Sequence, residues 1–185
     1  MTDFPTLTLR GLRADDWLPL QAIFADEAVL RDTLEVPYAG EEPFRERLTS
    51  PPAGTHTLIA ELMLPSGRER VVGLAWLRVM VPPRRRHTAT LQIVVHADYG
   101  AGEIEEAILR AALDLSDNWL ALRRVEVRLF AGDEARAEML ARHGFVREAV
   151  MRRYAVRAGE YVDGWLMARL RPASAQAPAT GEGSA

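Results

Sequence analysis

Residues 88–115 read TATLQIVVHADYGAGEIEEAILRAALDL, and the fold class follows from this stretch. Residues 88–96 are rich in β-branched and apolar side chains and predict a strand. From Glu103 onward apolar residues recur every three or four positions, with charged residues on the other side, which predicts an amphipathic helix. A strand that ends in a tight turn before a helix N-terminus presents free N–H groups and the positive end of the helix dipole. Such a turn is a natural phosphate-binding site.

Further strand and helix patterns lie on both sides of this stretch. Upstream we expect two strand-forming regions separated by helices: a strand at 6–10, a helix from Asp15 and Asp16, a less regular segment ending in a short helix at 41–48, and a hairpin of 55–64 and 69–81. Downstream we expect a strand at 125–130, a helix at 133–143, and a second hairpin of 146–156 and 161–170. This order predicts an α/β (α+β) fold with one mixed, mostly antiparallel sheet and helices on both faces.

Composition limits the class of protein. The chain has 185 residues, 48% of them hydrophobic and 26% charged, as expected for one globular domain, which we place at residues 1–171. Residues 172–185 are small and polar without periodicity, which predicts a disordered tail. No apolar run is long enough for a membrane span, and the N-terminus lacks a secretory pattern, so we expect a cytoplasmic protein.

The charge and the absence of cysteine exclude other classes. A net charge of −3 gives no reason to expect a nucleic-acid partner, and the run Arg84-Arg85-Arg86 follows two prolines in an expected loop. Without cysteine there are no disulfides, no thiolate catalysis and no cysteine-ligated zinc. The four histidines are scattered without a metal-binding spacing, so we expect no metal site.

Several motifs, taken in order, resemble the GNAT superfamily of N-acetyltransferases. The resemblance runs from about Leu9 to Arg171 and is most specific in the C-terminal third, in the segments HGFVRE (143–148), RRYA (152–155), GEYVD (159–163) and MARL (167–170). Within the superfamily the chain looks most like bacterial enzymes that acetylate the α-amine of L-amino acids, through TLEVP (33–37), ERL (46–48), RRH (85–87) and DNWL (117–120). Enzymes that acetylate the N-termini of ribosomal proteins are similar as well.

The resemblance implies acetyl-CoA as the cofactor. In the family its pyrophosphate lies on the N–H groups of a loop with glycine or alanine at two positions, where a side chain would come between amides and phosphates. The corresponding residues here are Gly100, Ala101, Gly102, Glu103, Ile104 and Glu105, with glutamates at both of those positions. A carboxylate opposes phosphate binding, although acidic residues also suit the first turn of any helix. The other residues implied in cofactor binding are Ile93, Val94 and Val95, where the central strands should splay, and Asp133.

The catalytic positions of the family carry different residues in this chain. The tyrosine that usually protonates the departing thiolate corresponds to Leu140, and a glutamate that often serves as general base corresponds to Thr90. Neither residue exchanges a proton near neutral pH. Tyr154 or Tyr161 of the C-terminal motif can replace the missing acid.

The resemblance also indicates where the acceptor binds. It implies one wall of the acceptor pocket at Thr33, Pro37 and Tyr38, and it places His87 at a strand start that faces the cleft. Histidine titrates near neutral pH, so His87 is the candidate for taking a proton from the substrate amine, with a structural hydrogen bond as the alternative.

Two classes of function remain open from the sequence, and acetylation of a protein N-terminus is an enzyme variant of the first. The first is direct transfer of an acetyl group from acetyl-CoA to the primary amine of an amino acid or a similar small molecule. The second is a GNAT-fold protein with impaired catalysis that acts as a ligand-binding or partner-binding module. The resemblance also implies that a homodimer can form through the C-terminal strands.

Overall fold

The computed structural model describes residues 6–99 and 102–171, so the predicted tail and the loop residues Gly100 and Ala101 lie outside the described residues. The elements in chain order are β1 (Thr6–Gly11), α1 (Trp17–Ala25), α2 (Glu27–Asp32), α3 (Glu41–Thr49), β2 (Thr55–Met63), β3 (Glu69–Val79), the 3₁₀ turn η1 (Pro83–Arg85), β4 (Thr88–Val95), the 3₁₀ turn η2 (Ala97–Tyr99), α4 (Glu103–Asp114), the π-helical turn η3 (Leu115–Trp119), β5 (Arg124–Phe130), α5 (Glu134–Arg142), β6 (Phe145–Arg157) and β7 (Glu160–Leu170).

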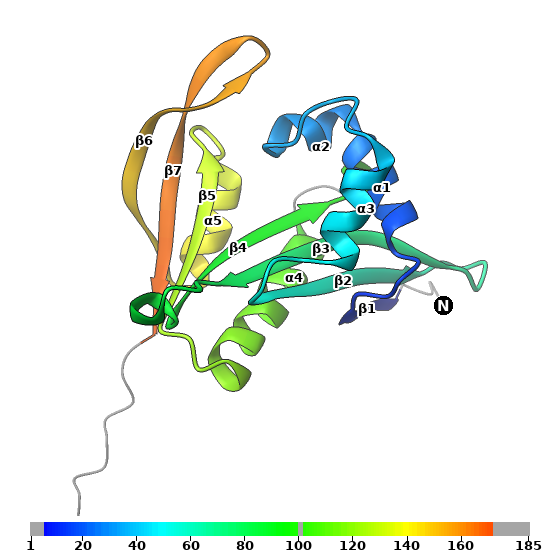
Figure 1. Cartoon of the computed structure of the whole chain (residues 1–185), viewed down its shortest axis with the longest axis horizontal. Helices are drawn as coiled ribbons and strands as arrows, with labels where there is room; N and C mark the ends of the chain where they lie inside the picture. The colour runs from blue at the N-terminus through cyan, green and yellow to red at the C-terminus, as the bar shows by residue number, and fades with distance from the viewer. Residues whose placement is uncertain (1–5, 100–101, 172–185) are drawn as a thin grey trace, which may run out of the picture.

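The strands form one seven-stranded sheet in the order β1-β2-β3-β4-β5-β7-β6. All neighbours are antiparallel except β4 and β5, which are parallel. The β4–β5 ladder contains only three residue pairs and stops at Thr90 and Glu126, after which the two strands diverge (Figure 1). The predicted fold class and the predicted splay between the central strands are therefore confirmed.

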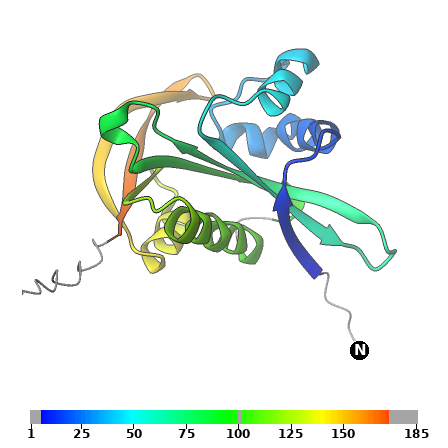
Figure 2. The same ribbon diagram turned by 60° about the horizontal axis from the view of Figure 1, so that its bottom comes forward.

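Helices cover both faces of the sheet (Figure 2). Helix α4 packs on one face in a core that also contains Leu140 of α5. Helices α1, α2 and α3 cover the other face, over β2, β3 and β4, in a second core. The second core ends at Trp76, so the part of this face over the end of β3, the start of β4 and β5 carries polar side chains instead.

Helix α4 lies close to the sheet because β3 has a glycine beneath it. A Cβ at Gly73 would come within 2.7 Å of the Val94 carbonyl oxygen and 3.2 Å of Ile108 Cδ1. After α4 the chain continues through the π-helical turn η3, whose Asp117 receives two hydrogen bonds of 2.8 and 2.7 Å from Arg169 on β7. The end of the helix is thus tied to the sheet near the start of β5.

Two local features differ from the expected pattern. The segment after α1 contains the helix α2, which begins at Asp26 because that carboxylate accepts hydrogen bonds from the Ala28 and Val29 N–H groups. Strand β6 contains a β-bulge between Met151 and Ala155, where Arg153 takes a positive φ of 51°. A bulge redirects side chains that a regular strand would alternate.

Candidate active site

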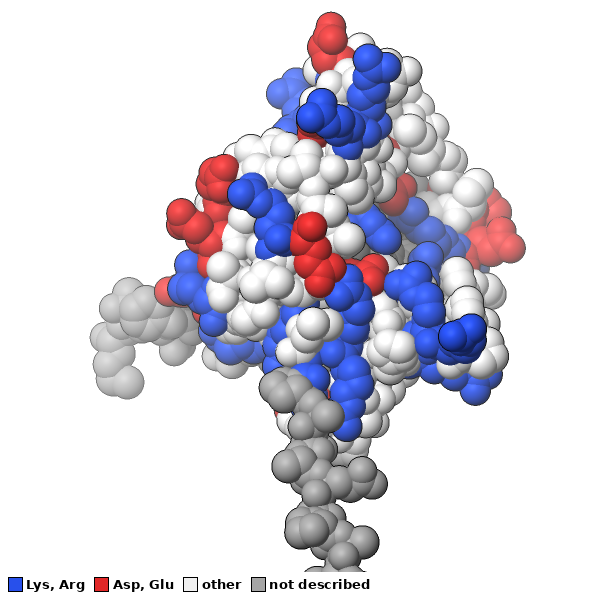
Figure 3. Space-filling model, turned by 90° about the vertical axis from the view of Figure 1, so that its left-hand side faces the viewer, with Lys and Arg blue, Asp and Glu red and all other residues white. Residues whose placement is uncertain are grey.

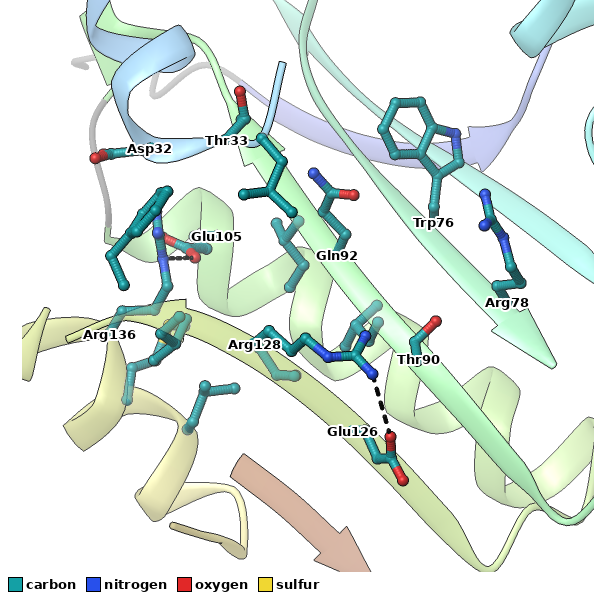
Figure 4. Close-up of a pocket in the computed structure, with 18 of the residues that line it drawn as sticks. Asp32, Thr33, Trp76, Arg78, Thr90, Gln92, Glu105, Glu126, Arg128 and Arg136 are labelled. Carbon is teal, nitrogen blue, oxygen red and sulfur yellow. Dashed lines mark hydrogen bonds and ion pairs between the residues drawn. The ribbon is translucent and has the colours of Figure 1, made fainter. Parts of the chain in front are cut away.

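A cleft opens where β4 and β5 diverge (Figure 4). Its walls come from β3, β4 and β5, its far end from α4 and α5, and its rim from α2 and β6. Since the β4–β5 ladder stops at Thr90, the β5-facing backbone groups of β4 beyond that residue have no partner on β5. The cleft therefore combines open backbone groups with side chains from seven elements.

Three of the lining residues form a row across neighbouring strands. Arg78 of β3 pairs with Thr90 of β4, and Thr90 pairs with Glu126 of β5. Residues paired in this way project to the same face of a sheet. All three line the cleft and lie on the sheet face that carries α1–α3 (Figure 4).

Glu126 is a buried carboxylate surrounded by arginines. Its residue is 6% exposed, and its Oε1 accepts hydrogen bonds from Arg85 Nη2 at 3.1 Å and Arg124 Nε at 2.8 Å. Its Oε2 lies 3.8 Å from Arg128 Nη2, beyond hydrogen-bond distance. Arginine side chains gather on this side of the molecule, where β5 begins, β7 ends and η1 lies (Figure 3). One oxygen of Glu126 is thus anchored, and the other forms no hydrogen bond with another described residue.

Arg78 is the cationic member of the row. The other arginines that line the cleft, Arg128 and Arg136, each have a carboxylate within 4.0 Å. Arg78 forms no hydrogen bond or ion pair with another side chain in the part of the chain that is described. An exposed guanidinium that faces a cleft without a partner is suited to an anionic ligand group.

A second charged group closes the α4–α5 end of the cleft. Glu105 of α4 is 2% exposed, and its Oε1 accepts a hydrogen bond of 2.6 Å from Arg136 Nε of α5. Arg136 also donates to Asp133 Oδ2 at 3.0 Å. Glu105 Oε2 is buried and has no hydrogen-bond partner. Burial raises the pKa of Glu105, and the charge of Arg136 opposes that rise. The pair joins the two helices across the cleft.

Tyr154 reaches the cleft because of the bulge in β6. Its ring packs edge-on against Phe130 with centroids 6.0 Å apart and lies directly over Gly164, where a Cβ would come within 2.7 Å of two ring carbons. Burial raises the pKa of the Tyr154 phenol, while the charge of Arg128 lowers it. Tyr154 and Leu140 both line the cleft, whereas Tyr161 is 70% exposed and does not. A phenol is therefore present in the cleft, on a different element from the one the family uses.

The residues implied in cofactor binding lie in different surroundings. Ile93 and Glu105 line the cleft, Val94 is buried in the core beneath α1–α3, and Val95 pairs with Gly73 at the end of β4. Gly102 and Glu103 are exposed at the start of α4, and Ile104 packs against the α4 core. Asp133 begins α5 by accepting a hydrogen bond from the Arg136 N–H. The two glutamates of the loop therefore point to different places, one outward and one onto Arg136.

The residues implied in acceptor binding are divided between two hollows. Thr33 lines the cleft and also an adjoining, more apolar groove between α1, α2 and the β6–β7 turn. Pro37 and Tyr38 line only that groove, and Tyr38 is fully exposed. His87 is exposed just before β4 and is not among the residues that line either hollow. A hydrogen bond of 2.9 Å between Arg157 Nη2 and Asp32 Oδ1 joins the β6–β7 hairpin to α2 beside the cleft.

Sequence reasoning missed Arg78, Glu126 and Arg136. A signal for the first two was present, because in a strand that alternates between faces both fall between apolar residues that project to the opposite face. Arg136 falls in the first turn of a helix, where nothing in the sequence indicates its partner on α4. Among the described residues no group of acidic or histidine side chains is arranged to hold a metal ion, and no helix is long and apolar enough to cross a membrane.

Comparison with known proteins identifies the family to which the chain belongs. No protein-family model matches the chain. The chain is 30% identical over 165 residues to an L-amino acid N-acetyltransferase of Escherichia coli K12, covering 89% of this chain and 98% of that protein. This relationship shows that the chain belongs to the GNAT family of N-acetyltransferases.

Solved structures have the same fold. An acetyltransferase of the GNAT family from Streptococcus pneumoniae matches with a TM-score of 0.72 and 22% identity, over 90% of this chain and 100% of that one. A spermidine N-acetyltransferase from Vibrio cholerae, in complex with CoA and spermine, matches with a TM-score of 0.76 and 19% identity, over 89% of this chain and 95% of that one. At these identities the likeness concerns the fold alone.

Proposed function

We propose that the protein transfers the acetyl group of acetyl-CoA to the α-amine of a free L-amino acid. The relative from Escherichia coli acts on L-amino acids, and it aligns with nearly the whole of this chain. The observation that carries the proposal is Arg78, a guanidinium in the cleft without a partner among the described residues. A free amino acid is an amine that also brings a carboxylate for such a group.

The same arginine argues against two other acceptors. A polyamine has no carboxylate, so it would leave the guanidinium of Arg78 without an anionic partner. The N-terminus of a protein has an amide where a free amino acid has its carboxylate, so it would leave the guanidinium unpaired. A free carboxylate forms charge-assisted hydrogen bonds with arginine, each stronger than a bond to a neutral amide oxygen.

The residues of the cleft fit acetyl-CoA. The backbone of β4 beyond Thr90 is open toward the cleft, as a pantetheine arm between the central strands requires. The concern raised by the two glutamates is smaller than the sequence suggests, because Arg136 balances the charge of Glu105 and Glu103 is exposed at the surface. When bound, the cofactor supplies an activated acetyl thioester.

The chain's own residues would hold the cofactor and donate a proton. Backbone N–H groups near Ile93, Val94 and Val95 would contact the pantetheine arm, and N–H groups at the start of α4 would face the phosphates. Tyr154 is our candidate for the proton donor in place of Leu140, since its phenol lies in the cleft. The expected homodimer and cytoplasmic location stay predictions.

One assay tests both which acceptor the protein uses and whether Arg78 recognises the carboxylate of that acceptor. A panel of L-amino acids, their amides and polyamines is assayed by release of CoA, with wild-type protein and with Arg78→Met. We expect free amino acids to be the best acceptors. We expect Arg78→Met to lower kcat/KM about 10- to 150-fold, mainly through KM, because a hydrogen bond to a charged group contributes about 1.5–3 kcal/mol. Arg84→Met, which changes an exposed arginine outside the cleft, is the matched control.

Two results would count against the proposal. If the protein acetylates an amino acid and its amide equally well, and Arg78→Met changes neither rate, then Arg78 does not recognise the carboxylate of the acceptor. No binding of acetyl-CoA in a calorimetric titration at millimolar concentration would leave the alternative, a binding module without catalysis.

A further inference from the structure

The two charged residues at the α4–α5 end of the cleft come from the first turns of two helices. Glu105 lies in the first turn of α4, and Arg136 lies in the first turn of α5. Both line the cleft, and a hydrogen bond from Arg136 Nε to Glu105 Oε1 joins them (Figure 4). We propose that Arg136 binds the pyrophosphate of acetyl-CoA and that Glu105 takes up a proton when it does. This inference rests on the proposed function, because it concerns the cofactor of that reaction.

The position of Arg136 suits an anion. The first turn of a helix carries unpaired N–H groups and the positive end of the helix dipole. No side chain at the N-cap position of α4 accepts a hydrogen bond from these groups, because that position is Gly102. The Arg136 side chain, 20% exposed, adds a full positive charge at the same end of the cleft. N–H groups and a guanidinium thus face one place, a combination that favours phosphate groups.

Carboxylates cancel this positive charge as long as all of them are ionised. Arg136 donates one hydrogen bond to Glu105 and another, of 3.0 Å, to Asp133, so a single guanidinium faces two carboxylates. Asp32 at the end of α2 acts on Glu105 as a further negative charge, although it also has a partner in Arg157 of β6. The pyrophosphate of a cofactor therefore needs one of these carboxylates to lose its charge.

Glu105 is the carboxylate whose surroundings favour a proton. It is 2% exposed, and burial raises its pKa against the opposing charge of Arg136. Its Oε2 is buried and has no hydrogen-bond partner among the described residues. A proton on Oε2 changes this oxygen from an acceptor without a donor into a donor, and a phosphate oxygen can accept its hydrogen bond. Arg136 can keep its bond to Oε1, because the guanidinium has further N–H groups for the phosphate.

The other charged and titratable groups near this end of the cleft have partners or positions of their own. They are Asp133, which begins α5 by accepting from the Arg136 N–H, Asp32 with Arg157, Arg128 of β5 with Glu126, Tyr154 of β6 beside Phe130, the exposed Glu103, and Glu106, which pairs with Arg142 and His143 of α5. The strands beneath α4 contribute apolar residues to its core. Glu106 and its partners do not line the cleft, so they provide matched controls.

The first experiment measures proton uptake with a cofactor analogue that has no phosphate titrating near neutral pH. S-acetyl-3′-dephospho-CoA keeps the pyrophosphate and lacks the phosphate monoester, a group whose second pKa is about 6. Calorimetric titration of the full chain in two buffers with different ionisation enthalpies gives the number of protons bound with the analogue. We expect uptake that approaches about one proton per site between the pKa of Glu105 in the free protein and its higher pKa in the complex. Across this window Kd should rise by up to about tenfold per pH unit, and below and above it Kd should be constant.

Glu105→Gln holds this side chain in a neutral form that can still donate a hydrogen bond. We expect this variant to bind the analogue about tenfold or more tightly than wild-type protein at about pH 8, because it needs no proton. Its binding should show no proton uptake, and its Kd should change little with pH. The matched control is Glu106→Gln, at the next position of α4, which should keep the wild-type Kd within about threefold together with the wild-type proton uptake.

Arg136→Met is tested in the Glu105→Gln background, since the single change would leave a buried carboxylate alone. We expect the double variant to bind the analogue about 10- to 150-fold more weakly than Glu105→Gln, as for the loss of a hydrogen bond to a charged group. S-acetyl-pantetheine, which has no phosphate, should bind to both variants with the same Kd. Glu106→Gln with Arg142→Met removes a pair that joins the same two helices outside the cleft, and it should bind the analogue as Glu106→Gln does. If the double variant does not fold by circular dichroism, tighter and pH-independent binding by Glu105→Gln supports the proposal, and unchanged binding overturns it.

The outcomes distinguish this inference from the proposed function. Wild-type protein that binds the analogue without proton uptake, or Glu105→Gln that binds it no more tightly at about pH 8, overturns the inference alone. A double variant that binds the analogue as well as Glu105→Gln, or that loses the same factor toward S-acetyl-pantetheine, overturns it too. Wild-type protein that binds neither the analogue nor acetyl-CoA overturns the proposed function, and the inference with it.

Discussion

The buried pair of Glu105 and Arg136 allows a quantitative prediction. Glu105 is 2% exposed; among the described residues its Oε1 accepts a hydrogen bond of 2.6 Å from Arg136, and its second oxygen has no hydrogen-bond partner. Arg136→Met removes the compensating charge and leaves a buried carboxylate alone, a change that costs about 3–5 kcal/mol in the free energy of unfolding. For a protein of this size, that loss lowers Tm by about 6–20 °C.

A double-mutant cycle shows whether the loss comes from the isolated charge. Replacing both members, as Glu105→Leu with Arg136→Met, removes the carboxylate as well and should recover most of the stability, because apolar pairs often replace buried ion pairs without cost. Urea unfolding followed by circular dichroism gives all four free energies. We expect an interaction energy of at least about 2 kcal/mol. Single variants that each lose less than about 1 kcal/mol, or a double variant that loses their sum, would refute the reasoning.

The same pair predicts how stability depends on pH. Burial raises the pKa of Glu105 in the folded state above its unfolded value. The folded state therefore binds this proton more tightly than the unfolded state does. Ionised Glu105 lowers the free energy of unfolding at pH values above its folded-state pKa, and this loss disappears as the pH falls through that pKa. In Arg136→Met the opposing charge is gone, so its stability deficit at pH 7 should shrink on acidification, until other carboxylates begin to titrate.

Two further predictions concern the cleft and its loop. Gly164→Ala places a Cβ within 2.7 Å of the Tyr154 ring, so we expect a loss of about 1–3 kcal/mol in unfolding free energy and a lower kcat at unchanged amino-acid KM. Gly11→Ala, where a Cβ meets nothing within 4 Å, is the control, and an unchanged kcat in Gly164→Ala would exclude Tyr154 as the donor. Glu103→Gln removes an exposed carboxylate at the start of α4, so acetyl-CoA should bind about 2- to 5-fold more tightly, the equivalent of 0.3–1 kcal/mol. Calorimetry at low and high salt checks this, since screening should reduce the gain, and unchanged or weaker binding at low salt would contradict it.

The fold was predictable because its strongest signals are periodic and local. The alternation in β5 and the apolar stripe of α4 each extend over enough residues to outweigh local exceptions. Helix α2 was missed because it has only six residues and depends on the Asp26 cap and on packing against α1. The bulge in β6 was missed because its positive φ falls on Arg153, not on a glycine.

The site was less predictable because its residues become neighbours only through the register in which the strands pair. Each strand pattern shows which residues share a face, but the alignment of one strand with its neighbour depends on the whole sheet. Arg78, Thr90 and Glu126 are separated by twelve or more positions in the chain and become neighbours only through two different ladders. The family motif compares one sequence position at a time, so it reports the loss at Thr90 and does not detect the carboxylate beside it.

The family positions that appear lost in the sequence therefore have to be compared with the side chains that surround them in the structure. Taken one position at a time, Thr90, Leu140 and Glu105 each lack what the family uses there, and together they suggest an inactive protein. In the structure, Glu126 lies beside Thr90, Tyr154 lines the same cleft as Leu140, and Arg136 balances the charge of Glu105. Each compensating group comes from an element other than the one that lost it. Loss of function alone does not explain why three such groups line one cleft. We therefore favour an active enzyme over a binding module.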